Sequence, residues 1–230
     1  MIEVDRKSVS EPAEFTRRAV SATKTLRLHV VRGETFRKQN QLPLNEELLA
    51  APDLLDALQG LFRGCCAFCE TPLLDSEKKF AAHFRPRQRA SQLGGKVDPL
   101  HYWWLTYAWS NLYSICSSCQ SIRGTRFPVR GKRAALGSNT GIKSERALLL
   151  DPCAEDPEAV LLFTDDGLVA STSERGSTTI DVFGLNRASL VQARRDHCRR
   201  VDHIGDQFLD RNQPEQWDEQ KFIAAVMGET

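Results

Sequence analysis

Two Cys-x-x-Cys pairs constrain the fold of this chain more than any other feature. The pairs are Cys66 with Cys69 and Cys116 with Cys119. Each pair presents two thiolates from one short turn, and four thiolates suit the tetrahedral coordination that Zn²⁺ prefers. In a reducing compartment this spacing favours metal binding over disulfides, and the odd total of seven cysteines agrees with it. We predict a structural zinc site; the alternative is four buried thiols without a metal.

The composition is that of an ordinary globular protein, with 41% hydrophobic and 27% charged residues among 230. No apolar run approaches the roughly 18 residues that a membrane-spanning helix needs, and the first residues lack the apolar core of a signal peptide. We therefore expect a cytoplasmic protein with no membrane partner. The formal net charge is only +1, so the positions of the charges carry more information than their sum.

Basic residues gather in two segments that contain no acid. Residues 78–97 and residues 120–144 each hold six lysines or arginines. Two such segments around one candidate site favour binding to a polyanion such as a nucleic acid. The alternative is a solvated surface without a ligand.

The stretch between the cysteine pairs contains His83 and Asn111. Short strands are expected at residues 79–84 and 112–115, followed by a short helix that ends at Gly124. A histidine can accept a proton near neutral pH, and an asparagine can hold a loop. Taken alone, each of the two is more often structural.

The same stretch holds three of the four tryptophans and all three tyrosines of the chain. We expect most of them on a helix that begins after Asp98. These rings can stack on bases, but a small metal-stapled module also needs a large apolar anchor. We therefore predict that the aromatic residues form its core.

Hydrophobic periodicity divides the chain into three regions. Residues 1–60 form an N-terminal helical region, residues 61–135 form the zinc-stapled core, and residues 136–230 form a C-terminal mixed α/β lobe. In this lobe we expect short strands, at residues 148–152 among others, and a long helix over about residues 187–209. The predicted fold class is α+β.

Taken together, these motifs resemble one particular family. The stretches Cys-Ala-Phe-Cys, His-Phe-Arg-Pro-Arg, Trp-Ser-Asn-Leu, Cys-Ser-Ser-Cys and Gly-Leu-Asn-Arg are similar to those of HNH endonucleases, also called the ββα-metal fold. Within them, the match is to the nuclease subunit of Septu-type and retron-associated anti-phage defence systems. The resemblance covers roughly residues 60–200. It implies an endonuclease that acts on DNA, or alternatively tRNA, beside an ABC-type ATPase partner. We also expect that the chain can form a homodimer within a larger assembly.

The resemblance implies a role for each site residue. His83 would be the general base that activates water, and Asn111 would hold the loop that bears it. The zinc would be purely structural, and a separate Mg²⁺ or Mn²⁺ would sit on the scissile phosphate. Neighbouring phosphates would be bound by four arginines, namely Arg85, Arg87, Arg123 and Arg126. For Arg85 and Arg87 the alternative is solvation of a loop.

Two positions depart from the family pattern. Ala82 stands where the family has an Asp, Glu or His that binds the catalytic metal, and Gln120 stands where it has Asn or His. A methyl group cannot bind a cation, whereas a Gln carbonyl can. Three explanations stay open: Ala82 is an introduced inactivating substitution; the metal is held by Gln120, substrate and water; or the module only binds. The alternative functions are therefore a catalytically impaired nucleic-acid-binding or scaffold subunit, and a zinc-knuckle interaction module.

Overall fold

The computed structural model of this chain describes residues 1–73, 81–209, 220 and 223–224. It has a mixed α+β architecture in which helices dominate, and each sheet of the described residues consists of two very short strands. This confirms the predicted fold class. Within the described residues, no helix is both long and apolar enough to cross a bilayer.

The N-terminal region is helical, as predicted. A short 3₁₀ turn, η1 (Arg6–Ser8), precedes the helices, which are α1 (Ala13–Val31), α2 (Glu34–Gln39), α3 (Glu46–Leu49) and α4 (Pro52–Leu61). The side chain of Asn45 caps α3 by accepting a hydrogen bond from the Leu48 amide at 2.9 Å. In α4, Pro52 occupies the first turn, and Leu54, Leu58 and Leu61 are buried.

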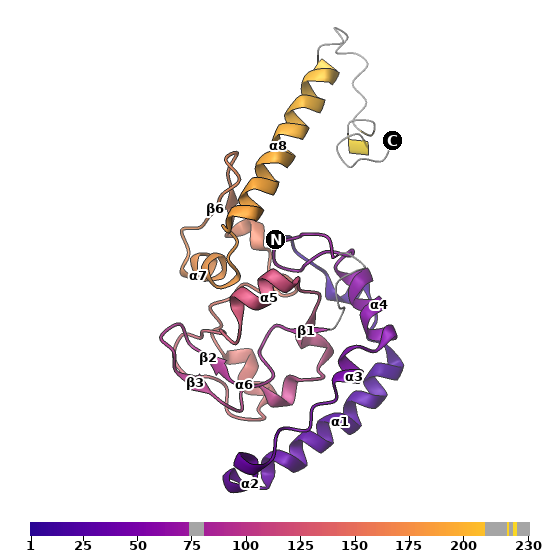
Figure 1. The fold of residues 1–230 in the computed structure, drawn as a ribbon, viewed down its shortest axis with the longest axis vertical. Coiled ribbons are helices and arrows are strands. Elements are labelled where there is room, and N and C mark those ends of the chain that lie inside the picture. Colours follow the sequence, from indigo (N-terminus) through magenta and orange to yellow (C-terminus); the bar gives the residue numbers. More distant parts are fainter. Residues whose placement is uncertain (74–80, 210–219, 221–222, 225–230) are drawn as a thin grey trace.

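The centre of the molecule is a pair of antiparallel strands followed by a helix (Figure 1). β1 (Ala82–His83) pairs with β4 (Leu112–Tyr113), so that His83 lies opposite Leu112. The helix α5 (Ser117–Arg123) ends at Gly124, as predicted. Both strands are shorter than predicted, and residues 79 and 80 of the first lie outside the described residues. A second small sheet pairs β2 (Ala90–Ser91) with β3 (Val97–Asp98).

The aromatic segment does not form the α-helix that the sequence predicts. It folds into two 3₁₀ turns, η2 (Trp103–Leu105) and η3 (Trp109–Asn111), separated by residues 106–108, of which Ala108 is extended. The reason is burial on every side: consecutive rings from Tyr102 onward are all buried, whereas a helix at the surface buries only one face. The expectation that these residues form core is confirmed.

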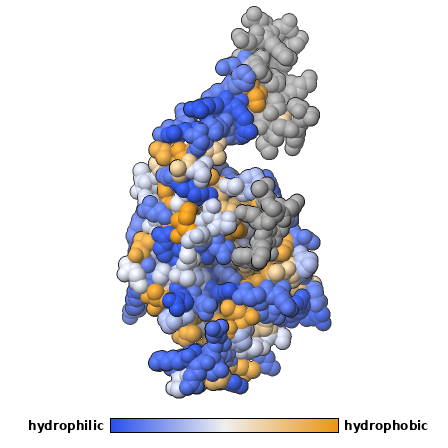
Figure 2. Space-filling model, viewed as in Figure 1, coloured by the Kyte–Doolittle hydropathy of each residue, from blue (hydrophilic) through white to orange (hydrophobic). Residues whose placement is uncertain are grey.

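The C-terminal lobe contains the elements α6 (Asn139–Ser144), η4 (Pro157–Ala159), α7 (Glu174–Phe183) and α8 (Ala188–Leu209), with a hairpin of β5 (Leu162–Phe163) and β6 (Val169–Ala170). The long helix predicted over residues 187–209 is therefore confirmed. It projects away from the body of the molecule (Figure 1), and hydrophilic residues cover much of it (Figure 2).

The strand expected at residues 148–152 is absent. These buried leucines pair with no strand; the Leu148 amide donates to the Pro128 carbonyl at 3.0 Å, and side chains bind backbone groups of the next two. Thr179 accepts a hydrogen bond from the Leu150 amide at 2.9 Å, and Arg175 donates to the Leu149 carbonyl at 3.0 Å. A run of apolar residues predicts burial, but it does not distinguish a strand from an irregular segment packed under a helix.

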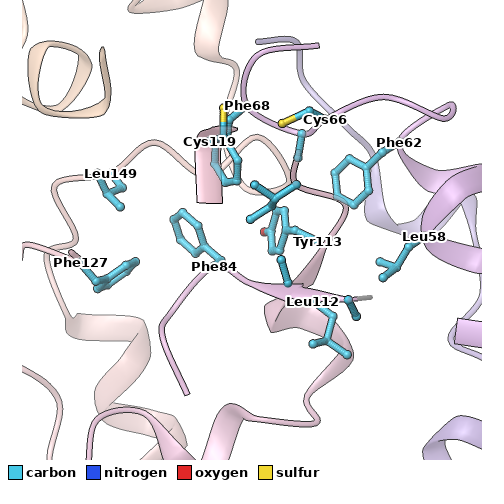
Figure 3. Packing of buried hydrophobic residues seen from close by; sticks show 14 of the residues in the cluster. Leu58, Phe62, Cys66, Phe68, Phe84, Leu112, Tyr113, Cys119, Phe127 and Leu149 are labelled. Atoms are coloured by element: carbon cyan, nitrogen blue, oxygen red, sulfur yellow. The ribbon is translucent and has the colours of Figure 1, made fainter. Parts of the chain in front are cut away.

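One apolar cluster includes residues of all three predicted regions, for example Phe15, Phe68 and Phe183. The rings of Phe68 and Phe183 stack with centroids 3.9 Å apart. Phe84, which directly follows β1, and Tyr113 of β4 lie at the middle of the cluster between the N-terminal helices and the C-terminal lobe (Figure 3). The central strands are thus held by side-chain packing more than by their few ladder hydrogen bonds.

Candidate functional site

The four predicted cysteines lie together. All are buried, and their Sγ atoms lie within 4.8 Å of one another, as shown for two of them in Figure 3. A tetrahedral zinc with Zn–S bonds of about 2.3 Å requires sulfurs about 3.8 Å apart, and Cys69 and Cys116 are separated by 3.6 Å. The cluster is therefore compatible with a structural zinc ion. Among the described residues it is the only group of three or more His, Cys, Asp or Glu side chains arranged to hold a metal.

Local backbone geometry forms each half of this cluster. The first pair lies on a tight turn in which the Glu70 amide donates to the Cys66 carbonyl at 2.9 Å. In the second pair Cys116 is the N-cap of α5, and its Sγ accepts a hydrogen bond from the Cys119 amide at 3.4 Å. The Ala67 amide donates to the Ser114 carbonyl at 2.8 Å, which joins the two halves.

Arg187 contacts the cluster, a role that sequence analysis missed. Its Nη2 lies 3.3 Å from Cys69 Sγ and its Nη1 lies 3.6 Å from Cys119 Sγ. Burial lowers the pKa of Arg187, but the hydrogen bonds and charges of the two sulfurs raise it further, so the net shift is upward. The only signal in the sequence was its place in the Gly-Leu-Asn-Arg stretch.

That stretch forms the tight turn between α7 and α8. Gly184 adopts φ 59°, and a Cβ there would lie 3.0 Å from the side chain of Ile122 in α5. The Asn186 side chain pairs with both backbone groups of Val169 at 2.8 Å. The turn therefore brings the start of α8, the β5–β6 hairpin and the cysteine cluster together.

His83 is buried on β1 in a single defined orientation. Its Nε2 lies 2.9 Å from the Thr106 carbonyl oxygen; since a carbonyl can only accept, Nε2 carries the proton and Nδ1 carries the lone pair. Nδ1 has no hydrogen-bond partner among the described residues, and 8% of the His83 surface is exposed. Burial, assisted by the charges of Arg87 and Arg123, lowers the pKa of His83 to about 3 against the opposing hydrogen bond to Thr106. The ring is therefore neutral at physiological pH.

The backbone that follows His83 is fixed from two sides. Asn111 accepts a hydrogen bond from the Arg85 amide at 2.7 Å and donates to the carbonyls of Arg85 and Leu105 at 3.0 and 3.1 Å. Arg123, buried on α5, donates to the carbonyls of His83 and Phe84 at 2.6 and 2.9 Å. These five hydrogen bonds hold the segment rigidly. α5 therefore bears two of the cysteines near its start and a clamp on the His83 segment at its end.

The four arginines expected to bind phosphates all have partners within the protein. Arg123 is buried on backbone carbonyls, and Arg126 donates to the carbonyls of Arg123 and Val182 at 3.2 and 3.1 Å. Arg85 pairs through Nε with Glu145 at 3.1 Å, and Arg87 pairs with Glu46 at 2.8 Å near the surface. Of the four, only Arg123 is buried; Arg85, Arg87 and Arg126 are half-buried.

The two positions expected to provide ligands for a catalytic cation, Ala82 and Gln120, differ from the cysteine cluster in what they offer a metal. Ala82 is buried, with 4% of its surface exposed, and lies opposite Tyr113. Gln120 is half-buried on α5, and its side chain forms no hydrogen bond with the described residues. Mg²⁺ and Mn²⁺ prefer carboxylate and other oxygen ligands. The described residues around His83 therefore do not supply the ligand set of a catalytic divalent ion.

Comparison with known proteins places this geometry in a context. The chain is 29% identical to the Septu protein PtuB of Bacillus mycoides strain KBAB4 over 218 residues, which are 91% of this chain and 71% of PtuB. It is also 32% identical over 134 residues to the Septu protein PtuA of the same strain. That match covers 58% of this chain but only 19% of PtuA. No family model matches the chain.

Proposed function

We propose that this protein is the nuclease subunit of a Septu-type anti-phage defence system and that His83 is its general base. The similarity to PtuB along 91% of the chain supports the assignment to a defence system. The combination of a four-cysteine cluster with two antiparallel strands and a helix supports an HNH-type, ββα site. Each part was expected from the residues that also carry the family resemblance.

The observation that carries the catalytic proposal is the orientation of His83. The hydrogen bond from Nε2 to the Thr106 carbonyl keeps the proton on Nε2 and leaves the lone pair on Nδ1, which has no partner among the described residues. In phosphodiester hydrolysis, Nδ1 would accept a proton from water while the water oxygen bonds to phosphorus and the bridging P–O bond breaks. The clamp formed by Asn111 and Arg123 would keep this nitrogen in place, since a general base works only within hydrogen-bond reach of its proton.

A second candidate function is a nucleic-acid-binding or scaffold subunit that does not cleave. The observation favouring it is Ala82, a buried methyl at the position where the resemblance implies a metal ligand. The Mg²⁺ or Mn²⁺ expected from the resemblance has no matching ligand set among the described residues, which also favours this candidate. Both candidates share the same fold and the same defence system.

Partners follow from the same comparison. Since the two relatives are both named as Septu proteins, we infer that this chain acts with a partner protein. The resemblance implies that the partner is an ABC-type ATPase. The resemblance favours DNA as the polymer, with tRNA as the alternative. The basic segments would suit either one, because both carry phosphate.

A cleavage assay tests the proposal and separates the two candidates. The chain is compared with Ala82→Glu and His83→Ala on plasmid DNA and bulk tRNA, with Mg²⁺ or Mn²⁺ and with chelator. His29→Ala, which alters another buried histidine, is the matched control, and zinc content and thermal melting check folding of every variant.

Three outcomes are distinguishable. If the chain or Ala82→Glu cuts, and His83→Ala abolishes cutting while His29→Ala does not, the nuclease proposal holds. If neither cuts but both retain nucleic acid, the scaffold function replaces it. Cleavage that is unchanged by His83→Ala would overturn the role given to His83.

A further inference from the structure

A cavity of about 380 Å³ lies between the segment after β1, residues 145–155 and α7. Four arginines line it, namely Arg85, Arg130, Arg146 and Arg175. Three acids line it as well, so the charges alone do not show what it binds. The hydrogen bonds already formed within the cavity wall determine which donor and acceptor groups remain available to a ligand.

The carboxylates of the wall already accept hydrogen bonds from the protein. Glu145 accepts from Arg85 Nε, from the Tyr102 hydroxyl and from the Ala134 amide at 3.1, 2.9 and 2.8 Å. Glu155 is held by both terminal nitrogens of Arg175 at 2.5 Å each. The third acid, Asp151, accepts from the Tyr113 hydroxyl at 2.5 Å and from the Cys153 amide at 2.9 Å. Both oxygens of Glu145 and of Glu155 are therefore taken, and of the three acids only Asp151 keeps an oxygen, Oδ2, without a partner among the described residues.

Hydrogen-bond donors of two arginines in the wall, in contrast, have no partner among the described residues. Arg85 uses Nε on Glu145, and its two Nη groups have no partner among the described residues. The Arg85 side chain lines the cavity, although only 14% of it is exposed. The Phe127 ring, 5.1 Å from the guanidinium carbon, helps to fix its plane. The Arg146 side chain likewise has no hydrogen-bond or ion-pair partner among the described residues.

Arg130 and Arg146 lie side by side at the rim. The Arg130 amide donates to the Arg146 carbonyl at 2.8 Å, next to the antiparallel bridge between Val129 and Ala147. Arg130 forms an ion pair with Glu174, but both side chains are more than half exposed, at 57% and 51%. An ion pair so exposed to water contributes little and is readily exchanged for a better partner.

We propose that this cavity binds a phosphoryl group. It offers unused guanidinium N–H groups from Arg85 and Arg146, with Arg130 beside them, and two of its three carboxylates, Glu145 and Glu155, are held on both oxygens. The guanidinium fork matches the oxygens of phosphate in geometry and in charge. The cavity volume also falls within the usual range of small-molecule sites, which begins at about 300 Å³. The phosphoryl group comes either from a free nucleotide or from a nucleic-acid strand.

The site connects to the His83 segment but does not depend on catalysis there. Arg85 follows His83 by two positions, and its backbone is the part that Asn111 clamps. A phosphate bound in the cavity therefore touches the same rigid segment. This inference stands whether or not the protein cleaves nucleic acid.

Isothermal titration calorimetry on the full chain at low ionic strength tests the proposal. The probes are inorganic pyrophosphate, ATP without Mg²⁺, and a short oligonucleotide. Arg146→Gln is the test variant because its exposed side chain is not needed for folding. Arg199→Gln, an equally conservative change of an exposed arginine on α8, is the matched control.

Arg146→Gln is expected to weaken binding of at least one probe by about tenfold or more, because a hydrogen bond to a charged group is lost. Arg199→Gln should leave binding unchanged. Binding of pyrophosphate and ATP identifies a free nucleotide as the source, and binding of the oligonucleotide alone identifies a nucleic-acid strand. The proposal is overturned if no probe binds, or if the two variants bind every probe equally.

Discussion

The cysteine cluster and the His83 segment are joined by one short helix, yet they differ in completeness. The cluster has four donors, all buried and spaced for one metal ion. The His83 segment has an oriented base and a rigid backbone, but alanine occupies the position of an expected ligand. α5 contributes Cys116 and Cys119 to the first and Arg123 to the second.

The difference teaches that scaffold and chemistry are separable in this fold. The contacts that hold the His83 backbone come from Asn111 and Arg123, and neither needs a catalytic cation. The backbone geometry can therefore persist with Ala82 at the position where the resemblance implies a metal ligand. The cysteine cluster has no such tolerance, because every thiolate is needed to complete the coordination.

The largest effect is expected from breaking the cluster. Cys119→Ser should abolish stoichiometric zinc binding and lower the Tm by on the order of 10 °C, since metal binding energy contributes directly to folding. Zinc analysis and calorimetry measure both quantities. Cys198→Ser, on the half-buried thiol of α8, is the control and should change neither. Equal Tm values for the two variants would mean that the four cysteines do not hold a stabilising metal.

A smaller loss of stability is expected when the hydrogen bonds that Asn111 forms with the His83 segment are removed. Asn111→Ala leaves the Arg85 amide and two carbonyls unpaired inside the protein, which should lower the free energy of unfolding by about 2–4 kcal/mol. Zinc content should stay at the level of the parent. Urea denaturation measures the loss, and Asn40→Ala, which removes one exposed hydrogen bond, is the control. A loss of zinc in Asn111→Ala would show that the two regions are not separable.

The third effect concerns Arg187, which reaches from the C-terminal lobe to two sulfurs of the cysteine cluster. Arg187→Ala removes the donor shared by Cys69 and Cys119 and should weaken zinc affinity by about 10- to 100-fold, as loss of outer-sphere partners usually does. Competition with a chromogenic chelator measures the affinity. The control is Arg194→Ala, since Arg194 contacts backbone carbonyls of the same lobe but no sulfur. If both variants retain zinc equally well, the contact of Arg187 with the sulfurs does not stabilise the metal.

Much of this architecture could be predicted from local signals. The Cys-x-x-Cys spacing identified the cluster, and the Gly124 stop and the long C-terminal periodicity identified α5 and α8. Each of these features depends on residues that are close together in the sequence. The aromatic segment was predicted wrongly as a helix because its rings are buried on all sides, which is a property of the assembled core.

Contacts between distant parts of the chain could not be predicted. In the sequence Arg123 lies among basic residues that favour phosphate binding, but it is buried on carbonyls about forty residues away. Arg85 likewise meets Glu145, and Arg187 meets Cys69, only because the fold brings them together. An arginine in a basic segment has the same local pattern in either role, so only the structure distinguishes them.

The smallest effect is the contribution of His83 to the pH dependence of the free energy of unfolding. It probes the His83 segment without a change to the cysteine cluster. Its folded pKa of about 3 lies below the value of 6.5 for an unperturbed ring, so the unfolded chain binds the proton first and acidification through pH 6.5 destabilises the fold. Between pH 8 and pH 6 this one group should lower the free energy of unfolding by about 1 kcal/mol. Denaturation of the parent and of His83→Gln at both pH values isolates it, because any protonation of the cysteine cluster affects both proteins alike. If the parent and the variant lose the same stability, the pKa of His83 is not lowered on folding, and burial does not hold the ring in its neutral form.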